Sequence, residues 1–398
     1  MLHSDASGAL WRARAGVAAV FFLNGFGYGS WVPRLAEIKD RLELSEGQLG
    51  LALFMAAVGA LFAMPLTGAL AGRHGSRAAT AVTVALYGLA VPGLALAPGL
   101  VGLGLALLAL GAASGALDVA MNAQGVAVEK RYRRPIMSSL HGMFSLGGMS
   151  GAASTGLIAG SVDLLPHFLL AGALVLVLGL FACAPMLPAS GEDRSGGPGF
   201  ARPSLGLLLP GVVALASLLS EGAMADWSAV YLSSSLGAGT TLAAAAFAAF
   251  SMTMAIGRFS GDRLVARLGG DIVVRAGGAL AAAGLGLTLL IGHPIVAVIG
   301  FALVGAGLSC TFPVVLSTAA RSPDMPPSAA IAAVCTLGYL GFLIGPPAIG
   351  GLAELIGLPA ALGLVVLLCA LIAALGGRAP DRPEDLSVQH RQHPALRP

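Results

Sequence analysis

The sequence predicts an all-α integral membrane protein in which twelve transmembrane helices form two pseudo-symmetric six-helix bundles. Of its 398 residues, 57% are hydrophobic even before the 57 glycines are counted, and only 10% are charged. About a quarter of the residues of a soluble domain are charged, so this chain lacks the polar side chains to cover such a domain. Twelve apolar stretches, each of about the 20 residues that span a bilayer, follow one another along the chain.

The composition also excludes several functions. A net charge of +3 without a basic stripe provides no surface for nucleic acid. The only lysines, Lys39 and Lys130, do not follow glycine, so the chain has no Gly-Lys-Ser/Thr phosphate loop for ATP hydrolysis. The four cysteines lie singly in apolar stretches, without metal-ligand spacing. We therefore expect a non-enzymatic protein of the lipid bilayer, with no metal, no cofactor and no nucleic-acid partner.

Proline, glycine and basic residues mark the breaks between the apolar stretches. We expect spans near 14–34, 48–71, 78–97, 101–128, 137–161, 165–186, 206–233, 241–261, 272–292, 295–319, 328–353 and 358–376. The longest internal polar segment, rich in Gly, Pro and Ser, falls between the sixth and seventh spans. The expected organisation is an N-terminal segment (1–13), a first six-helix bundle (14–186), a connecting loop (187–205), a second bundle (206–376) and a disordered tail (377–398).

The distribution of basic residues predicts the orientation. If the N-terminus is cytoplasmic, 19 of the 22 Lys and Arg residues fall on the cytoplasmic side, and only Arg34, Lys39 and Arg41 fall on the other. Cytoplasmic loops carry such an excess, so both termini are expected to be cytoplasmic, with the protein in a bacterial inner membrane. The first helix has no small-residue cleavage site and is expected to be retained rather than removed as a signal peptide.

Charged residues inside a span are costly and by default indicate function. Three acids lie well inside the expected spans: Asp118 in the fourth helix, and Glu221 and Asp226 in the seventh. Asp118 and Asn122 are four residues apart and share one stripe of their helix, whereas Glu221 and Asp226 are five apart and point in different directions. Duplicated six-helix halves with a polar site near the bilayer midplane are typical of transporters.

Two further helices carry polar groups. Asn24, Tyr28 and Trp31 recur at helical spacing on the first helix. His141 in the fifth helix is expected at the depth of Asn122 if the fourth and fifth helices are antiparallel neighbours. Histidine is the side chain that titrates near neutral pH, so this region offers groups that can carry a proton. The candidates for proton coupling are Asp118, Glu221, Asp226 and His141.

These residues also have structural interpretations, which the sequence leaves open. Asp118 could simply bond to Asn122 or to nearby backbone. His141 could lie at the membrane interface, and Trp31 and the Asp226-Trp227 pair could belong to an aromatic belt near the outer face. The glycine-rich run GFGYG at 25–29 follows no strand, so we interpret it as close helix packing rather than as a dinucleotide loop.

Two Gly/Arg-rich loops resemble those of the major facilitator superfamily, and the resemblance covers about 14–376. GALAGRHGSR (68–77) is similar to the superfamily's signature between helices two and three, except that Gly72 stands where the family usually has an acid. GRFSGDRLVARLG (257–269) occupies the same place in the second half. The resemblance implies a cytoplasmic gate at Arg73, Arg77, Asp262 and Arg263.

More specific strings, LDVAMNAQG, SSLHGMFSLGGMSGA and EGAMADWSAVYL, resemble the MosC-like and YbjJ-like bacterial subgroup, which is similar to the fucose:proton symporters. This resemblance implies that Asp118 and Asn122 take part in sugar and proton handling. The fucose symporters also use an acid in helix one, which this sequence lacks, so Glu221 and Asp226 are expected to take over part of that role.

The resulting hypothesis is a secondary transporter: a monomeric, proton-coupled symporter of a small polar, sugar or polyol-like solute that works by alternating access. The proton is the coupling ion. The substrate-binding candidates are Asn24, Tyr28, Trp31, Asn122, Gln124 and Trp227. One alternative is a proton-driven exporter of drugs or amphiphilic metabolites, with a cavity lined by Met121, Met143 and Phe144. Another is a transporter-like sensor that binds a ligand without flux.

Overall fold

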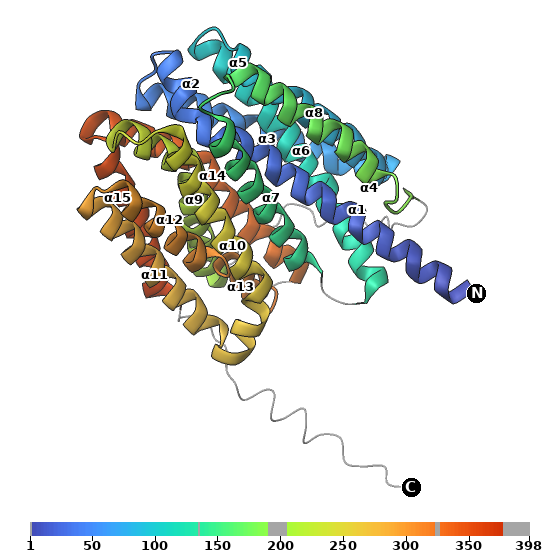
Figure 1. Ribbon diagram of the computed structural model, residues 1–398. Helices are drawn as coiled ribbons and strands as arrows, with labels where there is room; N and C mark the ends of the chain where they lie inside the picture. Colours follow the sequence, from blue (N-terminus) through green and yellow to red (C-terminus); the bar gives the residue numbers. More distant parts are fainter. Residues whose placement is uncertain (1, 134–135, 190–204, 323–326, 377–398) are drawn as a thin grey trace.

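The computed structural model describes residues 2–133, 136–189, 205–322 and 327–376, and all regular elements in these ranges are helical (Figure 1). The predicted all-helical fold is therefore confirmed. The first group of helices is α1 (Leu2–Trp31), η1 (Val32–Arg34), α2 (Leu35–Arg41), α3 (Glu46–His74), α4 (Ser76–Ala90), α5 (Gly93–Leu96), α6 (Leu100–Tyr132), α7 (Met137–Ile158) and α8 (Leu164–Cys183). The second group is η3 (Leu205–Leu207), α9 (Leu208–Val230), the π-helical η4 (Tyr231–Ser235), α10 (Thr240–Leu268), α11 (Gly270–Ile291), α12 (Pro294–Leu308), α13 (Thr311–Ala319), α14 (Pro327–Ile356) and α15 (Leu358–Leu375).

Among the described residues, 11 helical segments are long and apolar enough to cross a membrane. The twelfth crossing is α7, whose five glycines and five serines lower its hydropathy. It packs against α1 on one side and α10 on the other, so it needs less apolar surface than a helix that faces lipid. Together these helices make the twelve spans that the sequence predicts.

Two expected spans are interrupted. The third is divided after Ala90, and Pro92, which lacks a backbone N–H, lies in the break. The tenth is divided at Ser309 and Cys310, where the Ser309 hydroxyl donates to the carbonyl of Ala306 at 2.8 Å. The expected loop at 187–205 lies mostly outside the described residues, and the expected tail at 377–398 lies wholly outside them.

The two halves repeat one tight connection. Gly75 alone joins α3 to α4 with φ of 90°, and Gly269 joins α10 to α11 with φ of 84°. This backbone conformation is open to glycine and strained for other residues. The similarity between the two Gly/Arg-rich loops is therefore a repeat of backbone geometry as well as of composition.

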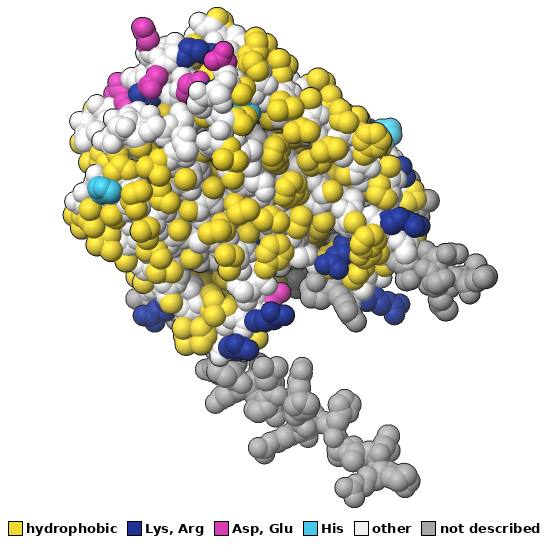
Figure 2. Space-filling model, in the orientation of Figure 1, with side chains coloured by type: hydrophobic (Ala, Val, Ile, Leu, Met, Phe, Trp, Pro, Cys, Tyr) yellow, Lys and Arg dark blue, Asp and Glu magenta, His cyan; other side chains and the backbone are white. Residues whose placement is uncertain are grey.

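Charged side chains gather at the two ends of the molecule (Figure 2). We call one the acidic end, which carries Glu37, Asp40, Glu43 and Glu46 together with Arg34, Lys39 and Arg41. The other is the basic end, where α3, α6 and α10 finish in basic residues. Hydrophobic side chains cover the band between the two ends (Figure 2), as expected for a surface that faces lipid.

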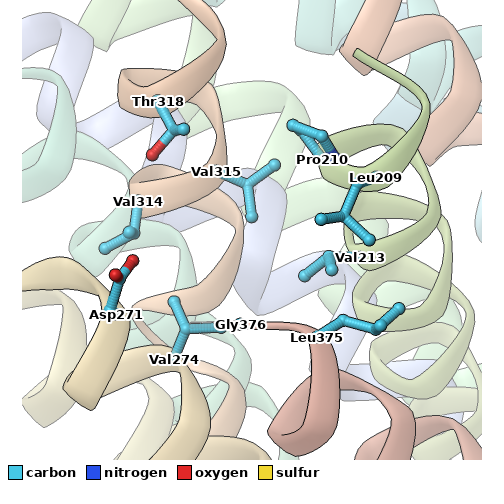
Figure 3. A pocket seen from close by; sticks show the side chains of 10 residues that line it. All are labelled: Leu209, Pro210, Val213, Asp271, Val274, Val314, Val315, Thr318, Leu375 and Gly376. Atoms are coloured by element: carbon cyan, nitrogen blue, oxygen red, sulfur yellow. The ribbon is translucent and has the colours of Figure 1, made fainter. Parts of the chain in front are cut away.

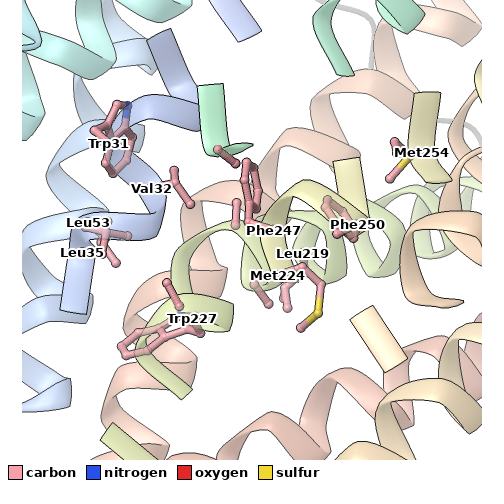
Figure 4. Packing of buried hydrophobic residues seen from close by; sticks show 14 of the residues in the cluster. Trp31, Val32, Leu35, Leu53, Leu219, Met224, Trp227, Phe247, Phe250 and Met254 are labelled. Carbon is pink, nitrogen blue, oxygen red and sulfur yellow. The ribbon is translucent and has the colours of Figure 1, made fainter. Parts of the chain in front are cut away.

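The two groups meet along two helix pairs, α3 with α14 and α7 with α10. At the acidic end, α3 and α14 approach so closely that a Cβ on Gly350 would lie 3.0 Å from the Cα of Gly50. Buried apolar side chains from both groups, including Val32, Met224 and Phe247, pack together near this end (Figure 4). Toward the basic end the two groups of helices diverge (Figure 1).

Candidate functional site

Asp118 and Asn122 lie on one stripe of α6, as their spacing predicts. The Asn122 amide donates to the Asp118 carboxylate at 3.0 Å and to the Asp118 backbone carbonyl at 2.8 Å. Both side chains are partly exposed although they lie in a long apolar helix. In the described part of the chain Asp118 forms no ion pair, so its carboxyl group has a hydrogen-bond donor but no counter-charge.

The polar stripe of α1 faces two different neighbours. Asn24 is buried, and its amide donates to the sulfur of Met121 in α6 at 3.7 Å, whereas its carbonyl oxygen has no hydrogen-bond partner among the described residues. Tyr28 turns toward the second group, with its ring 6.1 Å from that of Phe247 in α10 and 6.2 Å from that of Phe144 in α7. A buried polar atom without a partner is costly, so Asn24 has a hydrogen-bonding capacity that a ligand could use.

Glu221 of α9 pairs with Arg258 of α10 at the seam between the groups. One guanidinium nitrogen donates to the Glu221 carboxylate at 2.9 Å, and another donates to the hydroxyl of Ser145 in α7 at 2.8 Å. The side chains of Arg258 and Glu221 are 14% and 20% exposed. The sequence prediction missed Arg258 as a site residue: the expected eighth span ends at 261, near a basic loop, whereas α10 continues to Leu268.

Asp226 and Trp227 follow Glu221 in α9 and are more buried than Glu221. Neither forms an ion pair with a described residue. Asp226 is 9% exposed, and among the described residues its carboxylate has no hydrogen-bond or ion-pair partner, although it interacts electrostatically with Tyr28. Trp227 is fully buried and lies next to Gly350 of α14, and its indole N–H has no hydrogen-bond acceptor in the described part of the chain. The two acids of this helix thus have different surroundings, as their spacing predicts.

His141 of α7 lies beside the Glu221–Arg258 pair. Its ring is half-buried and packs edge-to-face on Phe21 of α1, with 5.3 Å between the ring centres. It is close enough to Arg258 to interact with the guanidinium electrostatically. No hydrogen bond joins His141 to Asn122 within the described ranges.

The amino-acid sequence of the chain matches a known protein family. Residues 17–334 match the model of a single protein family, the Major Facilitator Superfamily. The chain belongs to the major facilitator superfamily. It is therefore a multi-pass membrane protein and a secondary transporter of small molecules, and not an enzyme.

Similar proteins support this assignment over nearly the whole chain. An MFS-type transporter of Yersinia pestis is 38% identical over 355 residues, which cover 89% of this chain and 92% of that protein. The transporter y4wD of Sinorhizobium fredii is 36% identical, covering 92% and 97%, and the membrane protein MosC of Rhizobium meliloti is 32% identical, covering 90% and 88%. The resemblance to MosC that the sequence motifs indicate is thus confirmed.

Solved structures of this superfamily share the fold at low identity. The nucleoside transporter NupG superposes with a TM-score of 0.71 at 12% identity, covering 91% of this chain and 97% of that one. A bacterial homologue of the human lysosomal transporter Spinster, in an inward-facing and unoccupied conformation, superposes with a TM-score of 0.68 at 15% identity, covering 98% and 99%. The likeness supports the fold of this superfamily member and nothing about its substrate.

Tyr339, in the second half of this superfamily member, is a further polar residue that the sequence prediction did not single out. Tyr339 of α14 is 41% exposed, and it interacts electrostatically with Asp118 of α6 and Glu221 of α9. Its ring lies 6.3 Å from that of Phe342. The only signal in the sequence was a lone tyrosine in an apolar helix.

Two substrate-binding candidates make their contacts away from Asp118 and Asn122. Gln124 is fully buried in α6, and its amide donates to the carbonyl of Leu187 after α8 at 2.8 Å. This contact braces the basic end of the first half. Trp31 is 4% exposed and packs edge-to-face on Tyr28, with 5.3 Å between ring centres. Neither side chain lies next to Asp118 or Asn122, because each points toward the interior of its own helix group.

Three of the four residues expected to form a cytoplasmic gate lie on the surface. Arg73, Asp262 and Arg263 are exposed and Arg77 is half-buried. None of the four forms an ion pair with another described residue. This arrangement agrees with two groups that touch at the acidic end and diverge at the basic end.

A small cavity inside the second half is not a substrate site. It has a volume of about 30 Å³ and is lined mainly by apolar residues, with Asp271 and Thr318 at its edge (Figure 3). That space admits a water molecule or two but no sugar. The cavity also lies among α9, α11, α13 and α15, away from the groups described above.

Proposed function

We propose that this superfamily member is a proton-coupled symporter of a small polar, sugar or polyol-like solute, with the proton as its coupling ion and no other cofactor. The solute binds between the two halves, where Asn24, Tyr28 and Asn122 supply hydrogen bonds. Asp118, Glu221, Asp226 and His141 are the groups that can carry the proton. Trp227 of α9 contributes a buried aromatic side chain from the second half.

One observation carries this proposal. Asp118 and Asp226 are carboxyl groups in membrane-spanning helices, one in each half, and in the described chain neither has a counter-charge. A carboxylate without a counter-charge is costly in such a place, and a bound proton removes that cost. Two neutral hydrogen-bonding groups accompany Asp118. Asn122 lies on the same helix, α6, and Asn24 lies on α1, which contacts α6 through Met121. A polyhydroxy solute requires such groups.

The charge asymmetry supports a definite orientation. Excess Lys and Arg mark the cytoplasmic side of a membrane protein, so we propose that the basic end and both termini face the cytoplasm of a bacterial cell and that the acidic end faces outward. The contacts at the acidic end then make this conformation one that is closed to the outside. We expect it to function as a monomer, with each half moving as one body during alternating access.

The test is uptake into proteoliposomes, preceded by a thermal-shift screen of the purified protein. A ligand that binds the folded state raises its apparent stability by mass action, so the screen with sugars, polyols and amino sugars identifies the solute class. Uptake of the solute that the screen identifies is then measured with and without an inward proton gradient. Acceleration by the gradient supports the proposal, whereas uptake that ignores the gradient contradicts it.

A second candidate, a proton-driven exporter of amphiphilic compounds, is favoured by a different observation. Asn24 bonds to the sulfur of Met121, and Tyr28 lies between Phe144 and Phe247, so part of the site is apolar and adaptable. The exporter predicts thermal-shift hits among hydrophobic cations and sensitivity of deletion strains to those compounds. Hits confined to sugars or polyols exclude it.

A further inference from the structure

A groove on the hydrophobic surface of the second half belongs to none of the sites described above. It lies between α10, α11 and α12 and has a volume of about 170 Å³. Its walls are the side chains of Leu264, Leu268, Ile272 and Leu280, each at least 40% exposed. A water molecule takes about 30 Å³ in the liquid, so the groove has room for part of a lipid acyl chain.

The floor of this groove is made of small residues. Gly277 of α11 and Gly307 of α12 pack backbone against backbone, because a Cβ on Gly277 would clash with the carbonyl oxygen of Gly307. Ala276 and Ala306 beside them also line the groove, and both are exposed. A larger side chain at either alanine would occupy the space between the leucine and isoleucine walls.

Two arginines flank the groove near the basic end. Arg267 follows Leu264 by three residues in α10, and such residues are neighbours on a helix surface. Arg275 has the same spacing from Ile272 in α11. Both arginines are exposed, and neither forms an ion pair with another described residue. Lys and Arg side chains lie below the hydrophobic band in Figure 2, where Figure 1 shows the connection between α10 and α11.

The acids nearest in sequence do not neutralise this end of the groove. Asp262 comes two residues before Leu264, so the two side chains project from nearly opposite faces of α10. Asp271 of α11 lines a different cavity, beside α9, α13 and α15, and has a partner of its own. The groove therefore combines apolar walls with a cationic end that favours an anion.

We infer that this groove binds one anionic phospholipid, with part of an acyl chain between α10, α11 and α12 and the phosphate at Arg267 and Arg275. A guanidinium group can bind phosphate through two parallel hydrogen bonds. Basic pockets between membrane helices on the cytoplasmic side hold anionic headgroups in the same way. A free phosphate cannot use the apolar walls, and a zwitterionic lipid carries a positive group that the arginines repel. The inference does not depend on the solute or on proton coupling.

Native mass spectrometry of the full-length protein in detergent tests the inference, because it counts bound lipids one by one. The probes are palmitoyl-oleoyl phosphatidylglycerol, which is anionic, and the phosphatidylcholine with the same chains, which is zwitterionic. We expect the first phosphatidylglycerol to bind about 25-fold more tightly than the first phosphatidylcholine, since each arginine near an anionic headgroup contributes about fivefold.

Arg267→Gln and Arg275→Gln test the headgroup contact. Each is expected to lower the affinity for phosphatidylglycerol about fivefold, and the double variant about 25-fold, with no change for phosphatidylcholine. The matched control is the double variant Arg73→Gln/Arg131→Gln. It removes two exposed arginines from the last turns of α3 and α6, at the basic end of the first half, and should leave both affinities unchanged.

Ala276→Phe tests the acyl-chain contact, because it fills the groove from its exposed floor. The affinity for phosphatidylglycerol is expected to fall about tenfold, the loss of roughly two buried methylene groups. Ala279→Phe, at an exposed alanine of the same helix outside the groove, should leave it unchanged. Ala306→Phe repeats the test from α12, so the test does not depend on the folding of one variant.

Four results would overturn the inference. Equal affinities for the two lipids would mean that the groove holds only ordinary surrounding lipid. A double arginine variant that binds like the parent, or a control pair that loses as much, would remove the headgroup site. Unchanged binding in both phenylalanine variants would remove the groove. Dimers that Ala276→Phe abolishes would show that a second copy of the chain covers it. None of these measurements involves uptake, so an error in the proposed function leaves them unaffected.

Discussion

The carboxylate of Glu354, near the end of α14, accepts a hydrogen bond of 3.0 Å from the backbone N–H of Gly47, at the start of α3. The two residues are 307 positions apart and belong to different halves. The first N–H groups of a helix have no partner inside the helix, and they attract negative charge. Ser45 and Gln48 cap the same helix start from within the first half, so Glu354 adds a partner from the second half and closes the acidic end.

Glu354→Gln is expected to weaken this closure. The amide oxygen can still accept from Gly47, but the charge that favours the N-terminus of α3 is lost, at a cost of about 0.3–1 kcal/mol. The population open at the acidic end is then expected to rise about two- to fivefold, measured as the distance distribution between spin labels at Glu43 and Leu355. Asp40→Asn, at another exposed acid of this end, is the control and is expected to leave the distribution unchanged.

Gly350→Ala is expected to keep the acidic end from closing. The added Cβ would lie 2.8 Å from the backbone oxygen of Glu46 and 3.0 Å from the Cα of Gly50, so the helices must separate. At Gly351 the space is open, and alanine gains about 1 kcal/mol of helix propensity at either position. The same label pair should show opening for Gly350→Ala and none for Gly351→Ala; equal behaviour of the two variants would refute this account.

Arg34 and Glu37 are expected to differ in their effect on stability. Arg34 is 1% exposed, makes two bonds of 2.7 and 2.8 Å to Glu37, and donates to the Val162 carbonyl at 2.9 Å. Glu37→Ala leaves a buried unpaired cation, at a cost of about 3–5 kcal/mol. Arg34→Met leaves a carboxylate that is 36% exposed and can reach water, at a cost of about 1–3 kcal/mol.

Thermal unfolding followed with a thiol-reactive dye measures that difference, because Cys183, Cys310 and Cys369 are buried free thiols in the folded state. The midpoint should fall further for Glu37→Ala than for Arg34→Met. The reverse order would show that the surroundings of Arg34 compensate its charge without Glu37.

Asp118→Asn is expected to separate folding from transport. The asparagine oxygen still accepts the bond from Asn122, so the unfolding midpoint should change little. The new side chain cannot carry a proton, so gradient-driven uptake is expected to fall about 5- to 150-fold, the usual size of coupling between two sites. Exchange of solute without a gradient should persist. Asp163→Asn, at an exposed acid, is the control; uptake that survives Asp118→Asn would remove this residue from the coupling scheme.

Helical spacing predicted the relation between Asp118 and Asn122 because a residue and its fourth neighbour share a face in any α-helix. It could not predict the surroundings of Trp31 or Gln124, since periodicity identifies a face but not the helix that covers it. Arg258 illustrates a further limit. Hydropathy favours ending the eighth span near the first charges, whereas α10 continues to Leu268 and pairs its arginine with Glu221 and Ser145.

The sequence by itself determined the membrane class, the twelve spans, most of their breaks and the excess of basic residues at one end. Each of these depends on composition summed over a local window, with proline and glycine as local interruptions. Only the tertiary structure decided which faces meet, such as Glu354 with Gly47 and Arg258 with Ser145. Those partners lie 113 residues or more apart where hydrogen bonds join them, and their meeting depends on how all the helices pack together.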